Sequence, residues 1–187
     1  MRALLLGFFM LLMSPGLEAS EWIWKRSRIL EADLARALAL PREDLCHELG
    51  LYSCFTGVHL FALGGNDAVG RSQYTPLEQP TQLSAIAVER VVSQACLQRI
   101  ALDAETSAPV VFTSLKLQQT IAEQSETAVR AQIRSLSQRF LQRDPRAEEE
   151  QLLLHLADPQ RFGALPARDL AHGLCLAFGS QLEFLFF

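Results

Sequence analysis

Methionine is missing from the chain beyond residue 13, and the three methionines that exist are Met1, Met10 and Met13. The sequence Cys-x-x-Cys-His, which attaches haem covalently, is also absent. A c-type cytochrome is therefore excluded, because the usual His/Met axial pair has no methionine once an N-terminal leader is removed. The sequence Gly-x-Ser-x-Gly does not occur, so the sharp turn that presents the serine of an α/β-hydrolase is not encoded.

Positive charge is also scarce in this sequence. The chain has 17 lysines and arginines against 21 aspartates and glutamates, and its formal net charge is −4. Lys25 and Lys116 are its only lysines. Proteins bind nucleic acid and anionic membrane surfaces through basic stripes. The composition therefore argues against both partners, and we expect no nucleic acid. No cofactor is expected either, because the haem-attachment motif is absent.

No apolar run is long enough to cross a bilayer. The most apolar stretch, Ala3–Met13, is shorter than the ~20 residues that a spanning helix needs. Arg2 precedes it, Ser14–Gly16 breaks it, and Ala19 offers a small residue before a cleavage site. This order predicts a secretory signal peptide over residues 1–19, with an uncleaved N-terminal anchor as the alternative. We therefore expect a periplasmic or extracellular protein with no transmembrane segment in the mature chain.

The four cysteines are Cys46, Cys54, Cys96 and Cys175. An even number in an exported chain is most simply explained by disulfide bonds, and four cysteines allow three pairings. We favour Cys46–Cys54, which closes a short loop around Gly50, and Cys96–Cys175, which ties together two apolar helices. The alternative is that Cys96 and Cys175 are buried thiols.

Helical periodicity dominates the remaining sequence and predicts one mainly α-helical domain over residues 20–187. Helices are expected at 27–40, 43–49, from Ser84 to about 100, 128–141, from Asp144 onward, and 168–183. Short extended pieces are expected at 58–63 and 109–112. An irregular glycine- and proline-containing loop is expected over about 55–83. The apolar end, Phe184–Phe187, is predicted to pack into the core, and the acidic run Glu148–Glu150 to be a solvated helix start.

The long loop holds the candidate binding residues, because binding residues concentrate on loops that a rigid scaffold positions. Between apolar anchors it carries His59, Asn66, Asp67, Arg71 and Tyr74. A passive connector is the alternative interpretation of this segment.

Two familiar sites do not fit this loop. Its Gly65–Ser72 stretch is close to a phosphate-binding P-loop, but Arg71 stands where the lysine is required, and Pro76 and Pro80 interrupt the helix that should follow. The histidines lack the close helical spacing of a zinc site, and a disulfide-bonded Cys46 is no ligand. No metal site is predicted.

The C-terminal third contains two short motifs. Arg139–Glu149 matches the pattern R-x-L-x-R-x-P-x-x-x-E, and Ser180–Phe186 is close to S-x-E-F-L-F with one extra residue before the glutamate. On these motifs, residues 133–187 resemble the C-terminal helical region of exported planctomycete-type proteins of uncharacterised function, which elsewhere carry cytochrome c-like domains. That region has no assigned catalytic residues, and this chain lacks the haem-binding part.

Three functions are compatible with these observations. The first is a non-catalytic interaction or accessory protein whose partner is another exported protein. The second is an enzyme with no catalytic set recognisable in the sequence, whose site lies in the loop at His59, Asp67 and Arg71. It requires that these three side chains converge in a pocket. The third, implied only by the resemblance, is an accessory subunit of an exported redox complex that contains a cytochrome.

Overall fold

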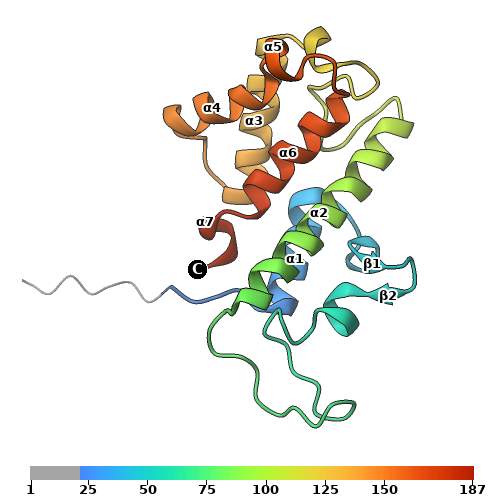
Figure 1. Ribbon diagram of the computed structural model, residues 1–187, viewed down its shortest axis with the longest axis vertical. Helices are drawn as coiled ribbons and strands as arrows, with labels where there is room; N and C mark the ends of the chain where they lie inside the picture. The colour runs from blue at the N-terminus through green and yellow to red at the C-terminus, as the bar shows by residue number, and fades with distance from the viewer. Residues whose placement is uncertain (1–21) are drawn as a thin grey trace, which may run out of the picture.

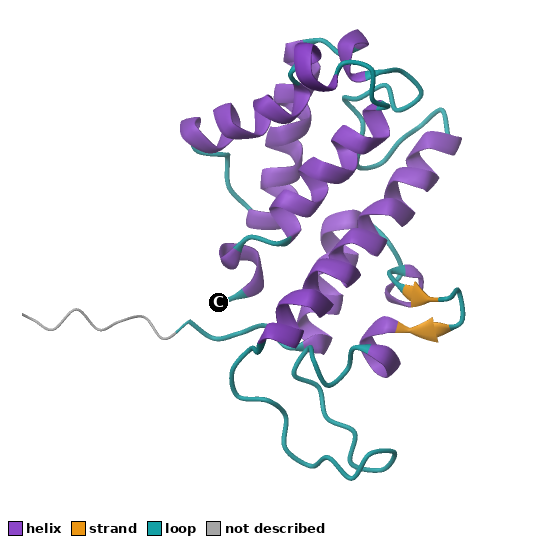
Figure 2. Ribbon diagram, viewed as in Figure 1, coloured by secondary structure: helices purple, strands orange, loops and turns teal. Residues whose placement is uncertain are grey.

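The computed structural model describes residues 22–187, so the predicted signal peptide at residues 1–19 lies outside the described part (Figure 1). The described chain is mainly helical, with a single small hairpin (Figure 2). The α-helices are α1 (Ser27–Leu38), α2 (Gln82–Glu105), α3 (Glu126–Leu141), α4 (Ala147–Leu154), α5 (Pro159–Phe162), α6 (Ala167–Gly179) and α7 (Leu182–Leu185). Short 3₁₀ turns are η1 (Arg42–Asp44), η3 (Ile121–Glu123) and η4 (His155–Ala157), and η2 (Cys54–Val58) is a π-helical turn. The two strands are β1 (His47–Glu48) and β2 (Tyr52–Ser53).

Four helices, α1, α2, α3 and α6, enclose the core. Helix α6 packs between α2 and α3, and α1 contacts both of those helices from the other side. The contact of α6 with α2 is close because Gly179 has no side chain, and a Cβ at that position would collide with Val92. The core is therefore set by tight helix packing, in which one added methyl group is felt.

Helix α1 forms as its periodicity predicts, with Leu30, Leu34 and Leu38 buried. It ends where Ala39 adopts a left-handed conformation with φ 50°. The helix predicted at 43–49 is wrong. After the single turn η1, the chain forms an antiparallel hairpin in which His47 pairs with Ser53 and Glu48 with Tyr52. The reason is the turn itself, since Leu49 and Gly50 both have positive φ, which reverses the chain and ends any helix.

The strand predicted at 58–63 is also wrong. Cys54–Val58 forms the π-helical turn η2, and the following residues up to Pro80 form turns and bends. Gly64, with φ 72°, lets the chain pass closely over the Trp24 ring. The predicted long irregular segment is therefore present, although it begins after η2 rather than at Phe55.

Several helix boundaries differ from the predictions. Helix α2 begins at Gln82, because Thr81 is the N-cap and Ser84 is its partner in a capping box. Helix α4 begins at Ala147 rather than at Pro145, because the Glu149 carboxylate accepts from the Arg146 amide and caps the helix there. The last helix is broken at Ser180–Gln181 into α6 and α7.

The segment 109–112 is coil held by a carboxylate rather than a strand. Buried Asp103 accepts hydrogen bonds from the amides of Val110, Val111 and Phe112 and pairs with Arg99. Chain segments 22–25 and 184–187 lie side by side, joined by an antiparallel bridge between Trp24 and Phe186. Phe184 is buried as predicted, whereas Phe187 is exposed.

Both predicted disulfides are confirmed. The Cα atoms of Cys46 and Cys54 lie 5.5 Å apart, and those of Cys96 and Cys175 lie 6.0 Å apart. The first disulfide connects the residue before β1 to the residue after β2, and the second joins α2 to α6. Two disulfides indicate an oxidising environment. Within residues 22–187, every helix is too short or too polar to traverse a lipid bilayer.

Candidate functional site

An apolar groove of about 750 Å³ runs between the N-terminal part of α2, the C-terminal part of α6, and α7. Trp24 and Phe186, which the antiparallel bridge joins, both contribute to its lining. Its lining comprises Trp24, Pro80, Thr81, Ser84, Ala85, Val88, Glu89, Gly173, Leu176, Ala177, Ser180, Leu182, Leu185 and Phe186. This volume lies within the range of ligand-binding pockets.

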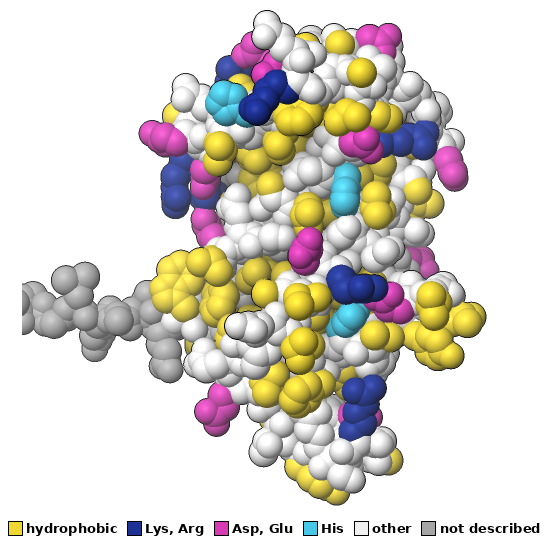
Figure 3. Space-filling view, viewed as in Figure 1, with side chains coloured by type: hydrophobic (Ala, Val, Ile, Leu, Met, Phe, Trp, Pro, Cys, Tyr) yellow, Lys and Arg dark blue, Asp and Glu magenta, His cyan; other side chains and the backbone are white. Residues whose placement is uncertain are grey.

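Small side chains make the groove shallow and accessible. Ala85 of α2 faces Gly173 and Ala177 of α6 across it, and Ala85 is exposed. On its rim, the exposed carboxylate of Glu89 forms no ion pair or hydrogen bond with the other described side chains. Large apolar side chains continue outward from the groove and are more than half exposed: Trp22, Ile23, Leu83, Leu182 and Phe187. Figure 3 shows hydrophobic side chains gathered where the chain near residue 22 meets the C-terminal end.

Four of the five candidate residues, Asn66, Asp67, Arg71 and Tyr74, take part in hydrogen bonds within the loop and its start. The Asn66 amide donates to the Tyr74 carbonyl over 3.4 Å, and the Asp67 carboxylate accepts from the Gly70 amide over 2.7 Å. Arg71 donates to a neighbouring carbonyl, that of Gly57, over 3.5 Å. These hydrogen bonds connect residues 57–74 to one another and so stabilise the loop internally.

The three residues required by the enzyme hypothesis are not brought together. A small cavity at this loop, of about 310 Å³, is lined by Asp67 but by neither His59 nor Arg71. His59 instead points toward the hairpin and donates from Nε2 to Glu48 Oε1 over 2.9 Å. His59, Asp67 and Arg71 therefore do not form a common site in the loop.

A polar cluster lies between the hairpin, η2 and α2. The Glu48 carboxylate accepts from His59 and from both Nε and Nη2 of Arg90, each over 2.9 Å. These hydrogen bonds, first from His59 and then from Arg90, lower the pKa of Glu48 below its ordinary value. Sequence reasoning noted His59 but missed Glu48 and Arg90, because the hairpin that positions Glu48 was expected to be a helix.

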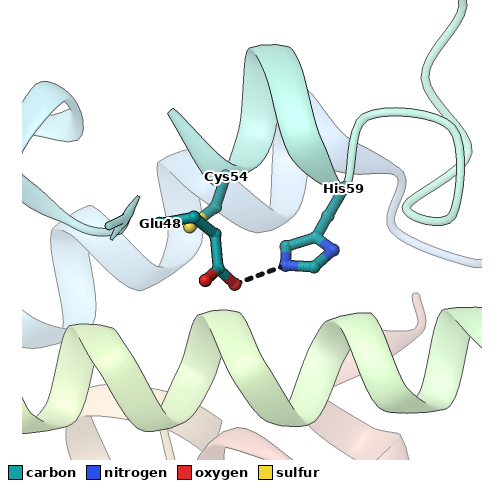
Figure 4. Close-up of side chains that lie close together, drawn as sticks. All are labelled: Glu48, Cys54 and His59. Carbon is teal, nitrogen blue, oxygen red and sulfur yellow. Dashed lines mark hydrogen bonds and ion pairs between the residues drawn. The ribbon is translucent and has the colours of Figure 1, made fainter. Parts of the chain in front are cut away.

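The same cluster includes a sulfur atom (Figure 4). A carboxylate oxygen of Glu48, a ring nitrogen of His59 and the Cys54 sulfur all lie within 4.8 Å of one another. Cys54 is bonded to Cys46, so in this state its sulfur is not a thiolate. The disulfide-bonded protein thus presents two free donor groups here.

One Ser–His pair lies on adjacent helices. Ser93 Oγ of α2 is 2.9 Å from His172 Nε2 of α6, which is the distance at which a base activates a nucleophile. Among the described side chains, no carboxylate hydrogen-bonds the other ring nitrogen of His172. The pair thus joins two helices and lacks the third group that orients a catalytic histidine. Ser93 and His172 are separated by 79 positions in the sequence, so no local motif predicts that they meet.

The two C-terminal motifs meet in one charge network. Arg143 forms paired hydrogen bonds to Glu149 and to Glu183, all between 2.7 and 2.8 Å. The Arg143 guanidinium lowers the pKa of Glu149 to about 2, and both carboxylates raise the pKa of Arg143. The motif residues therefore tie α3, α4 and α7 together.

The acidic run at the start of α4 is solvated only in part. Glu148 is exposed, but Glu149 binds Arg143, and buried Glu150 binds Arg130 and Arg134. The prediction of a solvated helix start is correct for the first glutamate and wrong for the other two, because arginines on and just after α3 reach across to them.

Comparison with known proteins adds no relative to these observations. A scan against protein-family models gave no match, and neither curated proteins nor solved structures matched the chain.

Proposed function

We propose that this chain is an exported, non-catalytic accessory protein that binds an apolar helical segment of another exported protein in the groove between α2, α6 and α7. The observation that supports this function is the groove itself, with its apolar lining and its margin of exposed Trp22, Ile23, Leu182 and Phe187. A contiguous exposed apolar surface rimmed by polar groups is typical of an interaction site.

The shape of the groove favours a helix as the occupant. Two antiparallel helix surfaces bound it, and Ala85, Gly173 and Ala177 leave room for the backbone of a third helix. Amphipathic helices bind in such grooves through apolar side chains one turn apart. Because the free carboxylate of Glu89 stands on the rim, we expect a basic residue on the bound helix beside its apolar face.

Two independent features support an exported location. Both disulfides indicate an oxidising environment, and the N-terminal segment has the order of a secretory signal. A periplasmic or extracellular partner is the corresponding expectation. An accessory role in a cytochrome-containing complex rests only on the resemblance of residues 133–187, and no contact in the groove favours it over other partners.

Site-specific photo-crosslinking in the native host tests this function. A benzoylphenylalanine side chain placed at Ala85 lies in the groove, whereas one placed at exposed Gln151 of α4 does not. We expect a discrete adduct with one exported protein from position 85 only. In the background of Ala177→Trp, which fills the groove, its yield is expected to fall about tenfold, equivalent to about 1.4 kcal/mol of binding free energy.

The stability of the groove-filling variant is the control. Thermal unfolding of Ala177→Trp shows whether the helices remain packed, and Glu89→Lys weakens binding without filling the groove. Equal adducts from positions 85 and 151, or an adduct unaffected by both substitutions, contradict the proposed function.

A further inference from the structure

The hairpin and the π-helical turn place four side chains of metal-binding types in one small volume. Cys46 directly precedes β1, and the Cys54 amide donates to the Cys46 carbonyl, which continues the strand pairing. Side chains two residues apart on a strand share a face, so Cys46 and Glu48 point to the same side. On the facing segment, Cys54 and His59 are related by the π-helical turn, in which the His59 amide donates to the Cys54 carbonyl over 2.8 Å.

We propose that Cys46, Cys54, His59 and Glu48 form a zinc site when the Cys46–Cys54 disulfide is reduced, so that the disulfide and the bound metal are alternative states of the same residues. This inference does not depend on the proposed function. π-Helical turns often occur at functional sites, and here Cys54 and His59 stand at the two ends of the turn with their side chains on the Glu48 side.

The donor set fits zinc. Two thiolates, an imidazole and a carboxylate are ligands that Zn²⁺ accepts in tetrahedral sites, at about 2.3 Å to sulfur and about 2.0–2.2 Å to nitrogen and oxygen. Ligand atoms around such an ion lie ~3.5 Å apart. The Glu48, Cys54 and His59 donor atoms already lie within 4.8 Å of one another, so a shift of about 1 Å brings these three to that spacing. The Cys46 sulfur moves away from the Cys54 sulfur once the bond between them is broken.

Arg90 is compatible with a bound ion. It donates to both Glu48 oxygens, and its side chain is half exposed, so it can keep one oxygen while the other binds the metal. Carboxylate ligands are ordinarily held by such an outer hydrogen bond. The donor groups are mostly buried but reachable, since the His59 and Glu48 side chains are 15% and 18% exposed.

The chemistry balances with a dithiol as the reductant. Two electrons from the dithiol break the Cys46–Cys54 bond and give two thiols, while the reductant becomes a disulfide. Each thiol loses a proton as its thiolate binds Zn²⁺, so binding releases two protons. In the absence of zinc, exchange with the oxidised dithiol reverses the first step: the Cys46–Cys54 bond forms again and the reagent returns to its two thiols.

The other disulfide offers no such site. Cys96 and Cys175 are fully buried between α2 and α6, and the Glu48, Cys54 and His59 group is the single cluster of metal-ligand type found among residues 22–187. We therefore expect metal binding to depend on whether the Cys46–Cys54 disulfide is reduced, and not on the Cys96–Cys175 disulfide.

Cobalt binding to the purified protein tests the site. The protein is reduced with a phosphine, which becomes the phosphine oxide, until alkylation and peptide mapping show free thiols at Cys46 and Cys54 only. We expect one Co²⁺ per chain, with the charge-transfer and visible absorption bands of tetrahedral thiolate coordination, and displacement by Zn²⁺. The oxidised protein should show no such bands.

Matched variants locate the ligands. His59→Ala and Glu48→Gln should each weaken cobalt binding at least ~10-fold, whereas His47→Ala should not, because His47 lies next to Glu48 on the opposite face of β1. Bound zinc should also slow re-formation of the disulfide by a thiol oxidant. Circular dichroism monitors the fold throughout.

Three results overturn the proposal. The first is the absence of thiolate bands in the reduced protein. The second is unchanged affinity in both His59→Ala and Glu48→Gln. The third is a loss of helical signal on reduction that zinc does not restore, since a site built by this hairpin requires the hairpin to persist.

Discussion

The Cys96–Cys175 disulfide lies inside the helical body formed by α1, α2, α3 and α6, whereas Cys46–Cys54 lies within the hairpin–loop region, residues 46–81. In the helical body, apolar side chains are buried and the cross-link joins two tightly packed helices. In the hairpin–loop region, large apolar side chains face solvent, among them Leu49 at 86% and Val69 at 97% exposure. Packing therefore stabilises the first region throughout. In the second, Phe55, Leu63 and the two cysteines join the core, while local covalent and polar links hold the exposed hairpin turn and the rest of the loop.

Leu49 shows the difference most clearly. It adopts a left-handed conformation, φ 55°, which is unfavourable for a leucine, and its side chain contributes almost no burial in return. The Cys46–Cys54 disulfide and the Glu48 hydrogen bonds to His59 and Arg90 hold the hairpin in place of a core. Figure 3 shows a second group of hydrophobic side chains at this turn.

Removing each disulfide in turn gives the largest expected effect. The Cys96–Cys175 bond spans a sequence separation of 79 and the Cys46–Cys54 bond one of 8. In the chain-entropy model, their losses lower the free energy of unfolding by about 4.5 and about 2.5 kcal/mol. Denaturant unfolding of the double alanine variants measures both values. Equal losses would show that the hairpin contributes to the core more than its exposure indicates.

Glycine substitutions in α6 test the packing of the helical body and give the next largest expected effect. Gly179→Ala is expected to lower the free energy of unfolding by about 1–3 kcal/mol, because its Cβ collides with Val92. Gly173→Ala is the matched control. Its Cβ meets only ordinary contact distances, so helix propensity should raise stability by about 0.5–1 kcal/mol. A similar effect of both substitutions on the melting temperature would contradict the close α2–α6 contact.

The charge network of the C-terminal motifs gives the smallest expected effect. The pKa of Glu149 is about 2 in the folded protein against an ordinary 4.5, so its carboxylate stabilises the fold above pH 4.5. That stabilisation is lost as the pH falls from about 4.5 toward 2, and we expect ~1–2 kcal/mol because both partners are partly exposed. Denaturant unfolding across this pH range measures it.

The arginine partner provides the control for this pH dependence. Arg143→Gln should flatten the decrease in stability below pH 4.5, whereas Arg168→Gln, outside the network, should leave it unchanged. An unaltered pH profile in Arg143→Gln would show that other carboxylates cause the loss.

Sequence periodicity predicts the helical body well. The spacing of Leu30, Leu34 and Leu38 identifies α1. The favoured disulfide pairing, which rests on predicted export, an even cysteine count and apolar helix faces, is the one the structure has. Boundaries shift by a few residues where capping side chains decide them, as Thr81 does for α2. Local patterns are informative here because each helix buries one continuous face.

The same reasoning fails where tertiary contacts and turn geometry dominate. Leu45 and Leu49 have helical spacing, but Leu49 and Gly50 turn the chain into a hairpin. The candidate groove joins three segments distant in sequence, around Trp24, Pro80–Glu89 and Gly173–Phe186, so no local motif announces it. The long loop, by contrast, is predicted from local sequence to carry the binding residues, but His59, Asp67 and Arg71 make separate contacts.

The bridge between Trp24 and Phe186 has an optical consequence. The chain has only two tryptophans, Trp22 and Trp24, and both lie where residues 22–25 meet residues 184–187. Trp22 also packs edge-on against Phe186. Tryptophan emission therefore reports on this junction and on the part of the groove that Trp24 lines, while far-ultraviolet circular dichroism reports on the helices. The two spectroscopic signals distinguish an event at the groove from unfolding of the body without any added label.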